Sequence, residues 1–235
     1  MLQRLLQAYN YARRLFISRD SLPYIHMQSG SRFVHSWPLA EDVTIEDVAN
    51  NLSKLCRYCG SIEGDNAIYS VAEHCVRASY IEPQWDALEK LLHDGSETFV
   101  VDLPRPLKYS PFMGVYKFYE HLADTVVAEK FHLKTDAITT ANVKYADKVM
   151  LVTEKRDLFA QDRVMCLNKM DDAEGITPLP EKIVPWTPEQ AKRAFLMRFY
   201  ELTGEDEFYK QHMTVTDSLW SGWRKWKKFY LLKTL

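Results

Sequence analysis

Four residues of the chain have the side chains of a transition-metal site: His74, the adjacent pair His93 and Asp94, and Asp147. Neutral imidazole suits zinc, iron or nickel, and carboxylate suits harder ions such as manganese. Each of the three segments has apolar residues at helical spacing, which predicts helices whose polar group points inward. Because a buried carboxylate needs a partner or a metal ion, the set indicates a divalent metal site.

These residues also have a structural interpretation. A single inward histidine or aspartate is more often a hydrogen-bonded core residue than a metal ligand. The order of the four residues along the chain favours the metal, because His93 and Asp94 present two donor groups from one helical turn. We therefore treat the four residues together as candidate ligands.

The composition is that of a compact globular protein. The 235 residues can bury a sizeable core and suit one large domain, or one domain with an extension. A formal charge of −2 argues against a protein that coats nucleic acid, and no run of about 18 apolar residues predicts a membrane-spanning helix. Four cysteines in a chain of this length do not make a secreted disulfide framework, so we expect a cytoplasmic location.

Helix signals divide the chain into helices and loops. Acidic residues after Thr44 open a helix that is expected to reach about Tyr58, and Thr187 followed by Pro188 opens another. The other expected helices lie around His74, around His93–Asp94, and over 116–131 and 139–160. The proline-rich segment 171–188 is expected to be a loop. Strand signals are scarce, so the predicted fold class is all-α.

We expect three parts: an N-terminal helical segment over 1–28, a main domain over 29–170, and a loop with a C-terminal helical extension over 171–235. The first nineteen residues hold four arginines and no acid, which favours a helix packed on the main domain over a transit peptide. The tail carries Trp220, Trp223 and Trp226 among basic residues. This aromatic stripe favours burial against the domain or a neighbouring subunit, with membrane or nucleic-acid contact as the alternative.

The order H…HD…D resembles the HD-domain superfamily of metal-dependent phosphohydrolases. The string LLHDGSETFVVDLPRPLK is similar to the HDxxE…DxPxPxK signature of its deoxynucleotide-hydrolysing branch. From about Ser29 to Thr203 the chain resembles small bacterial and phage members, among them 5′-deoxynucleotidases and phage dATP triphosphohydrolases. The resemblance implies an all-helical HD fold. It also implies one or two metal ions (Mn²⁺, Co²⁺, Zn²⁺ or Fe²⁺) at His74, His93, Asp94 and Asp147.

Catalytic roles follow from matching motif positions. Glu97 lies one helical turn after His93, where a carboxylate can orient or deprotonate an attacking water; the alternative is a solvated acid. The family has an aspartate near the leaving group or a second metal at the position of Asp102, which as an alternative caps a helix or turn. Lys108 follows a rigid Pro-Arg-Pro segment and is expected to bind phosphate oxygens. Arg105 is expected in a surface or structural ion pair.

Three further residues are expected to contact the substrate. Arg57 and Tyr58 match the position of an Arg-Trp pair in the 5′-deoxynucleotidases, where arginine can hold phosphate or sugar and the aromatic ring can stack on a base. Tyrosine is a smaller platform than tryptophan, and the loop before His74 differs from that of near relatives. Trp37 is a second candidate for base contact, with a place in the core as the alternative.

The resemblance implies a cytoplasmic hydrolase of bacterial or phage-infected cells that converts deoxynucleoside monophosphates to deoxynucleosides and phosphate. Two alternatives stay open: a triphosphohydrolase that releases triphosphate from dATP, and a module that senses a nucleotide without turnover. We also expect a homo-oligomer, and no stable nucleic-acid or membrane partner.

Overall fold

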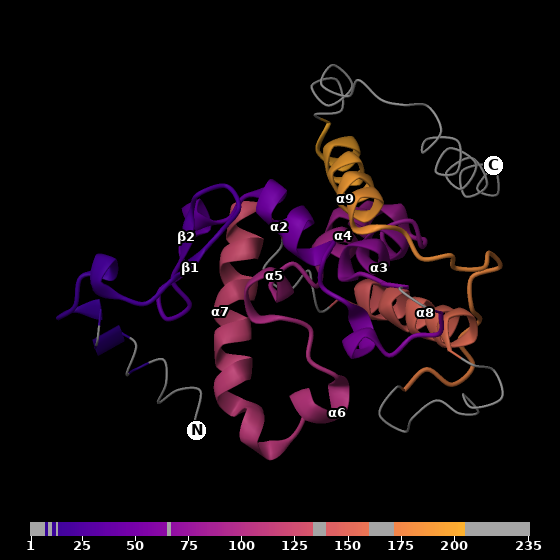
Figure 1. Cartoon of the computed structure of the whole chain (residues 1–235), viewed down its shortest axis with the longest axis horizontal. Coiled ribbons are helices and arrows are strands. Elements are labelled where there is room, and N and C mark those ends of the chain that lie inside the picture. Colours follow the sequence, from indigo (N-terminus) through magenta and orange to yellow (C-terminus); the bar gives the residue numbers. More distant parts are fainter. Residues whose placement is uncertain are drawn as a thin grey trace.

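The computed structural model describes residues 14–64, 67–133, 140–159 and 172–204, together with Ala8, Tyr11 and Ala12. Within this part the chain is mostly helical, which confirms the predicted class (Figure 1). The α-helices are α2 (Ile45–Leu52), α3 (Val71–Ala78), α4 (Ala87–Leu92), α5 (Glu97–Val100), α6 (Arg105–Lys108), α7 (Gly114–Lys130), α8 (Ala141–Leu158) and α9 (Pro188–Thr203). Short 3₁₀ turns lie at Arg19–Ser21, Ala40–Asp42, Arg57–Gly60, Gln84–Asp86 and Pro111–Met113.

A small antiparallel hairpin precedes the helices. Its strands, β1 (Ile25–His26) and β2 (Arg32–Phe33), pair Ile25 with Phe33. In Figure 1 the hairpin lies on one side of α7 and the other helices lie on the opposite side. The predicted N-terminal helical segment, 1–28, is described in part, and it contains the 3₁₀ turn Arg19–Ser21 and strand β1. The tryptophan-rich tail lies outside the described residues.

Side-chain caps mark the starts of helices α2, α3 and α9. The Thr44 hydroxyl accepts from the Asp47 amide at the start of α2, and the Ser70 hydroxyl accepts from the Glu73 amide at the start of α3. Thr187 and Gln190 form a capping box at α9, with Pro188 at the first helical position. The predicted loop before α9 is confirmed over its described residues, 172–187.

The helix that starts at Thr44 is shorter than predicted. It ends at Leu52 instead of about Tyr58, because the chain then turns to pair with the segment before α3. The Arg57 amide donates to the Tyr69 carbonyl at 2.9 Å, and the Val71 amide donates to the Leu55 carbonyl at 3.0 Å. Apolar spacing did not distinguish this bridge from a helix.

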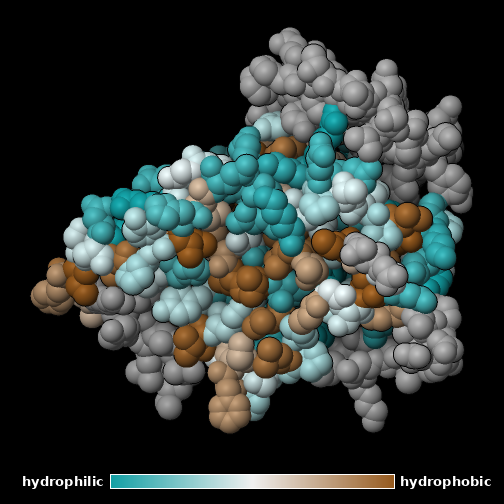
Figure 2. Space-filling view, viewed as in Figure 1, coloured by the Kyte–Doolittle hydropathy of each residue, from teal (hydrophilic) through white to brown (hydrophobic). Residues whose placement is uncertain are grey.

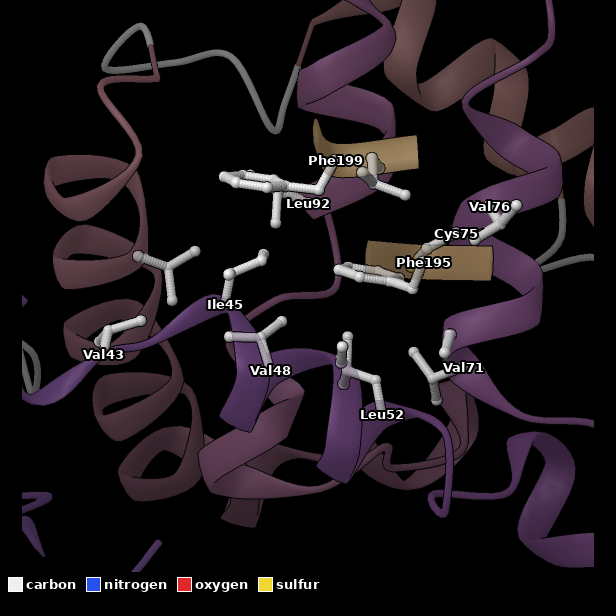
Figure 3. Close-up of a cluster of buried hydrophobic side chains, with 14 of the residues drawn as sticks. Val43, Ile45, Val48, Leu52, Val71, Cys75, Val76, Leu92, Phe195 and Phe199 are labelled. Atoms are coloured by element: carbon white, nitrogen blue, oxygen red, sulfur yellow. The ribbon is translucent and has the colours of Figure 1, made fainter. Parts of the chain in front are cut away.

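The core has two parts that meet at α3. The larger cluster joins α2, α3, α4 and α9, and Phe195 and Phe199 of α9 point into it between side chains of the other helices (Figure 3). The smaller cluster joins α3 to α8 through residues such as Ala78 and Met150. Every residue of α3 is consequently buried. A helix enclosed in this way holds its polar side chains in fixed positions.

Candidate metal centre

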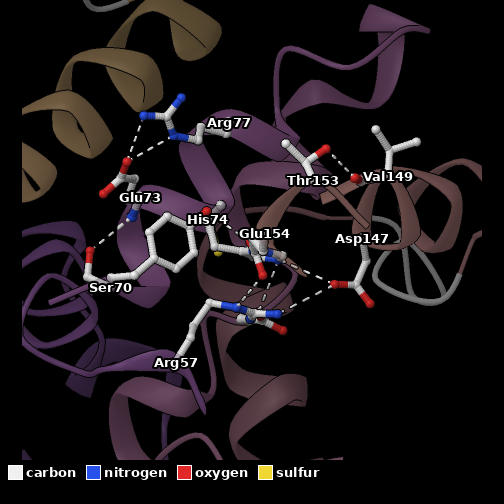
Figure 4. A network of polar contacts seen from close by, with 12 residues as sticks. Arg57, Ser70, Glu73, His74, Arg77, Asp147, Val149, Thr153 and Glu154 are labelled. Atoms are coloured by element: carbon white, nitrogen blue, oxygen red, sulfur yellow. Dashed lines mark hydrogen bonds and ion pairs between the residues drawn. The ribbon is translucent and has the colours of Figure 1, made fainter. Parts of the chain in front are cut away.

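His74 comes from the middle of α3 and is fully buried. Its Nδ1 lies 2.6 Å from the Glu154 Oε1 atom of α8, and its Nε2 lies 3.2 Å from His93 Nε2. Figure 4 shows the ring of His74 between Glu154, Asp147 and the guanidinium of Arg57. The ring therefore has one nitrogen held by a carboxylate and the other directed toward a second imidazole.

His93 and Asp94 lie in a turn, and not within the helix that was predicted around them. Helix α4 ends at Leu92, and α5 begins at Glu97. The break allows a close approach to α7, because a Cβ atom on Gly95 would lie 2.9 Å from the Leu92 carbonyl oxygen and 3.0 Å from Val127 Cγ1. The turn aims both side chains at His74: His93 Nε2 lies 3.3 Å from Asp94 Oδ2, which is 3.8 Å from His74 Nε2.

Asp147 reaches the same point from α8. Its Oδ1 atom lies 3.4 Å from His74 Nε2, and its Oδ2 atom lies 3.5 Å from a terminal guanidinium nitrogen of Arg105. Burial raises the pKa of Asp147, but its hydrogen bond to His74 and the nearby positive groups outweigh burial and hold the pKa far below its ordinary value. Asp147 is therefore a carboxylate, as metal ligation requires.

The hydrogen bonds of the two imidazoles decide which nitrogen is available. His93 Nδ1 lies 2.7 Å from the Lys90 carbonyl oxygen, and His74 Nδ1 faces the Glu154 carboxylate. Both partners are acceptors, so a proton on each Nδ1 would leave the Nε2 lone pair of each neutral ring to a metal ion. One ligand atom from each of His74, His93 and Asp94 lies within 4.8 Å of the others. This group could hold a metal ion.

Arg57 is the cation that faces these acids. Its side chain lies 3.2 Å from Asp94 Oδ2, 3.9 Å from Asp147 Oδ1 and 3.3 Å from Glu154 Oε2. Burial opposes the charge of Arg57, but the surrounding carboxylates raise its pKa well above the ordinary value. The predicted substrate residue thus lies beside the candidate ligands.

Tyr58 follows Arg57 with a positive φ of 56°, and Cys59 is similar at 53°. Non-glycine residues rarely adopt this region, so the pair is strained. The Tyr58 hydroxyl donates to Glu154, and the ring lies edge-on to Phe159 with centroids 5.1 Å apart. Tyr58 is therefore anchored at its hydroxyl end; base stacking on its ring stays a prediction.

Glu97 and Asp102 border the ligands on the side of α5. Glu97 is buried, and its Oε2 atom has no hydrogen-bond partner among the described residues. Burial raises the pKa of Glu97 well above its ordinary value, and Asp94 and Asp102 raise it further. Burial also raises the pKa of Asp102. Glu97 is thus neither a solvated acid nor a partner in a structural ion pair.

The two basic residues of α6 are both paired. Lys108 Nζ lies 2.5 Å from Glu120 Oε1 on α7, so a phosphate would compete with Glu120 for this cation. Arg105, which was expected in a surface or structural ion pair, forms one with Asp147. Arg105 therefore adds a cation at the edge of the candidate ligand set.

Trp37 contacts the N-terminal segment. The Arg14 guanidinium lies 5.1 Å from the centroid of its ring, and Arg19 Nε donates to its carbonyl at 3.0 Å. Neither contact joins Trp37 to the candidate ligands. Base contact by Trp37 therefore stays a prediction without a geometric link to the metal centre.

Two acidic residues near the candidate ligands, Glu154 and Asp124, were not predicted from the sequence. Glu154 lies seven residues after Asp147 on α8 and thus on the same helix face, a spacing that could have revealed it. Asp124 on α7 hydrogen-bonds to Ser96 beside the His93–Asp94 turn, and burial raises its pKa to about 6. Asp124 follows Glu120 by four residues and so lies on the same face of α7. This spacing of two acids could have indicated Asp124.

Comparison with known proteins identifies close relatives. The chain is 36% identical over 184 residues to the uncharacterized protein YfdR of Escherichia coli (strain K12), an alignment that covers 77% of this chain and 97% of YfdR. The chain belongs to the YfdR family. It is also 36% identical over 132 residues to the uncharacterized protein RCAP_rcc00048 of Rhodobacter capsulatus, covering 52% of this chain and 64% of that protein.

No protein-family model matches the chain. Among the described residues, none of the helices combines the length and the apolar character that crossing a membrane requires.

Proposed function

We propose that this member of the YfdR family is an HD-type, divalent-metal-dependent phosphohydrolase that acts on 2′-deoxynucleotides. The observation that carries the proposal is the convergence of ligand atoms from His74, His93 and Asp94, with Asp147 beside His74. Glu97 is buried close by, and its Oε2 atom has no hydrogen-bond partner among the described residues. The resemblance of the HDxxE…DxPxPxK string to the deoxynucleotide branch supplies the substrate class.

The donor set suits a divalent transition metal, with two imidazole nitrogens and two carboxylates. A bound metal of this kind lowers the pKa of a coordinated water toward neutrality. Glu97 would receive the proton of the attacking water as the general base. No described residue forms a competing hydrogen bond with Oε2, which leaves that atom available for the water.

Three cations offset the charge that develops on the phosphate oxygens. Arg57 lies on the candidate ligands, Lys108 lies at the side of Glu97, and Arg105 lies at Asp147. Each of them also faces carboxylates in this structure, so little positive charge remains for a long phosphate chain. We therefore propose a monophosphate substrate, whose hydrolysis gives a deoxynucleoside and inorganic phosphate.

Release of triphosphate from dATP is the second candidate. Arg105 favours it, because a triphosphate needs more cations than the two that the sequence indicated. A nucleotide sensor without turnover is the third candidate, and the placement of Glu97 argues against it, since binding alone needs no water-activating carboxylate.

Asp94→Ala tests the metal and the chemistry together. The purified variant should lack the metal that elemental analysis finds in the wild type, and it should hydrolyse neither dNMPs nor dNTPs. Asp172→Ala is the matched control, because Asp172 is exposed and pairs only with Lys148 among the described contacts. Full metal occupancy in Asp94→Ala would refute the ligand assignment.

A substrate panel separates the candidates. The wild-type protein, loaded in turn with Mn²⁺, Co²⁺ and Zn²⁺, is assayed for phosphate and triphosphate released from ribo- and deoxynucleotides. Phosphate from dNMPs supports the proposal, and triphosphate from dATP without activity on dAMP supports the second candidate. Equal rates on ribo- and deoxynucleotides would contradict the substrate class, and nucleotide binding without any product would favour the sensor.

A further inference from the structure

Glu154 is a buried carboxylate that accepts contacts from four side chains. It is fully buried on α8. One carboxylate oxygen, Oε1, contacts His74 Nδ1 at 2.6 Å and the Tyr69 hydroxyl at 2.9 Å. The other, Oε2, contacts Arg57 Nε at 3.3 Å and the Tyr58 hydroxyl. A carboxylate buried to this degree is costly unless charged or hydrogen-bonding partners surround it.

Three of the four partners of Glu154 are candidate site residues. His74 is a candidate metal ligand, and Arg57 and Tyr58 are the candidate substrate residues. Arg57 Nε lies 3.3 Å from Glu154 Oε2, which gives this buried carboxylate the cation that it needs. A carboxylate that accepts the Nδ1 proton of a histidine fixes the tautomer and makes Nε2 a stronger donor to a metal.

We propose that Glu154 is a positioning residue for the metal centre, which holds His74 with Nε2 toward the metal and couples it to the Arg57–Tyr58 segment. The inference rests on the metal site of the proposed function and adds a residue that the HD and DxPxPxK motifs do not contain. It implies that Tyr58 and Tyr69 influence metal affinity although neither side chain is a ligand in the proposed set.

The neighbouring residue provides a matched control. Thr153 is equally buried on α8, but its hydroxyl donates to the Val149 carbonyl and accepts from the Leu179 amide, away from His74 (Figure 4). Thr153→Val therefore removes buried hydrogen bonds from the same turn of the same helix. A purely structural role for Glu154 would make the two sites behave alike.

The test measures Zn²⁺ affinity by competition with a chromophoric chelator in the full-length protein. Glu154→Gln keeps the shape and a neutral acceptor, and should weaken binding about tenfold; Glu154→Ala should weaken it by up to about 100-fold. Tyr69→Phe should cause a smaller loss, and Thr153→Val should lower the melting temperature without changing Zn²⁺ affinity. If Glu154→Ala does not fold, the comparison of Glu154→Gln with Thr153→Val still decides.

A second readout is independent of activity. In the Zn²⁺-loaded wild type, the buried Nδ1 proton of His74 should give an exchange-protected, downfield NMR signal, which Thr153→Val keeps and Glu154→Ala loses. Equal Zn²⁺ affinities for Glu154→Gln and Thr153→Val, with the His74 signal unchanged, would overturn the role of Glu154 while leaving the metal site intact. A wild type that binds no metal would instead refute the proposed function.

Discussion

His74 and His93 are oriented by different kinds of acceptor. His74 faces the charged Glu154, whereas His93 faces the neutral backbone carbonyl of Lys90. Burial and Arg57 lower the pKa of His74, but Glu154 and Asp147 raise it more, to about 9. His74 is therefore a strongly basic donor, and a metal ion competes with a proton for its Nε2 atom.

Glu97→Ala should separate catalysis from metal binding. Glu97 is not in the proposed ligand set, so the variant should keep its metal and its substrate affinity. It should lose about 10²–10⁴ in kcat, the usual size of a general acid–base contribution. Metal content and kcat are measured on the same preparation, and turnover close to that of the wild type would leave the assigned role without support.

The raised pKa of Asp124 predicts that the stability of the folded protein depends on pH. Its pKa is raised from 3.8 to about 6 by burial and by Glu120 and Asp94, against Ser96 and Lys108, which lower it. The folded state therefore holds this proton more tightly than the unfolded state. The stabilisation is full below about pH 4 and is lost as the pH rises through 6.

Asp124→Asn should consequently gain stability relative to the wild type at pH 7.5 but much less at pH 5. The expected gain is of the order of 1–3 kcal/mol. Melting temperatures of both proteins at the two pH values provide the measurement. A difference in melting temperature that does not change with pH would show that Asp124 does not titrate in this range.

Two short segments between the helices position residues of the candidate site. Tyr58 and Cys59 have positive φ at the end of the bridge that delivers Arg57, and Val101 has a φ of 66° just before Asp102. A β-branched residue at positive φ is a clear outlier, and here the Tyr116 hydroxyl holds the Val101 carbonyl at 2.8 Å. Strain of this kind often accompanies functional sites, and both strained segments lead into candidate site residues.

Gly95→Ala should disturb the turn that carries His93 and Asp94. The added Cβ atom would meet the Leu92 carbonyl and Val127, and backbone cannot yield as a flexible side chain does. We expect a loss of about 1–3 kcal/mol in stability together with weaker metal binding. Denaturant unfolding and metal titration test the two effects, and a fully stable variant with unchanged metal affinity would contradict the proposed close packing against α7.

For the molecule as a whole, α9 is part of the core that surrounds α3. Phe195 is fully buried in the larger cluster, although it lies far along the sequence from the α3 residues of that cluster. The segment before α9 is tied to α3 as well, since the Trp186 amide donates to Glu73 at 2.7 Å. The C-terminal region therefore supports the helix that carries His74.

Phe195→Ala should destabilise the protein by about 3–5 kcal/mol and lower metal occupancy with it. Phe112→Ala is the matched control, because the Phe112 side chain is 92% exposed and its loss leaves the core unchanged. Figure 2 shows apolar side chains in the lower middle of this face, where Figure 1 places α7. Equal melting temperatures for the two variants would contradict the role assigned to α9.

The cytoplasmic location and the homo-oligomer stay predictions.

The sequence by itself determined the helical class, the starts of the helices that Thr44 and Thr187 cap, and the candidate ligands. These features depend on local signals: apolar spacing, threonine caps, and the order of histidines and aspartates in the chain. Such signals depend on residues that are close in sequence, so these features can be predicted without knowledge of the fold. The helix from Thr44 was predicted too long because the bridge that ends it pairs Arg57 with Tyr69, twelve residues further on.

Only the tertiary structure decided which groups face one another. It placed Glu154 beside His74 across 80 residues of sequence, and it gave Glu97 Oε2 no partner among the residues that the structure describes. It also paired Lys108 with Glu120 and Arg105 with Asp147, which changed the number of cations at the site. The reason is physical: the charge state and orientation of a buried group depend on the partners that packing brings to it, and residues remote in sequence supply most of them.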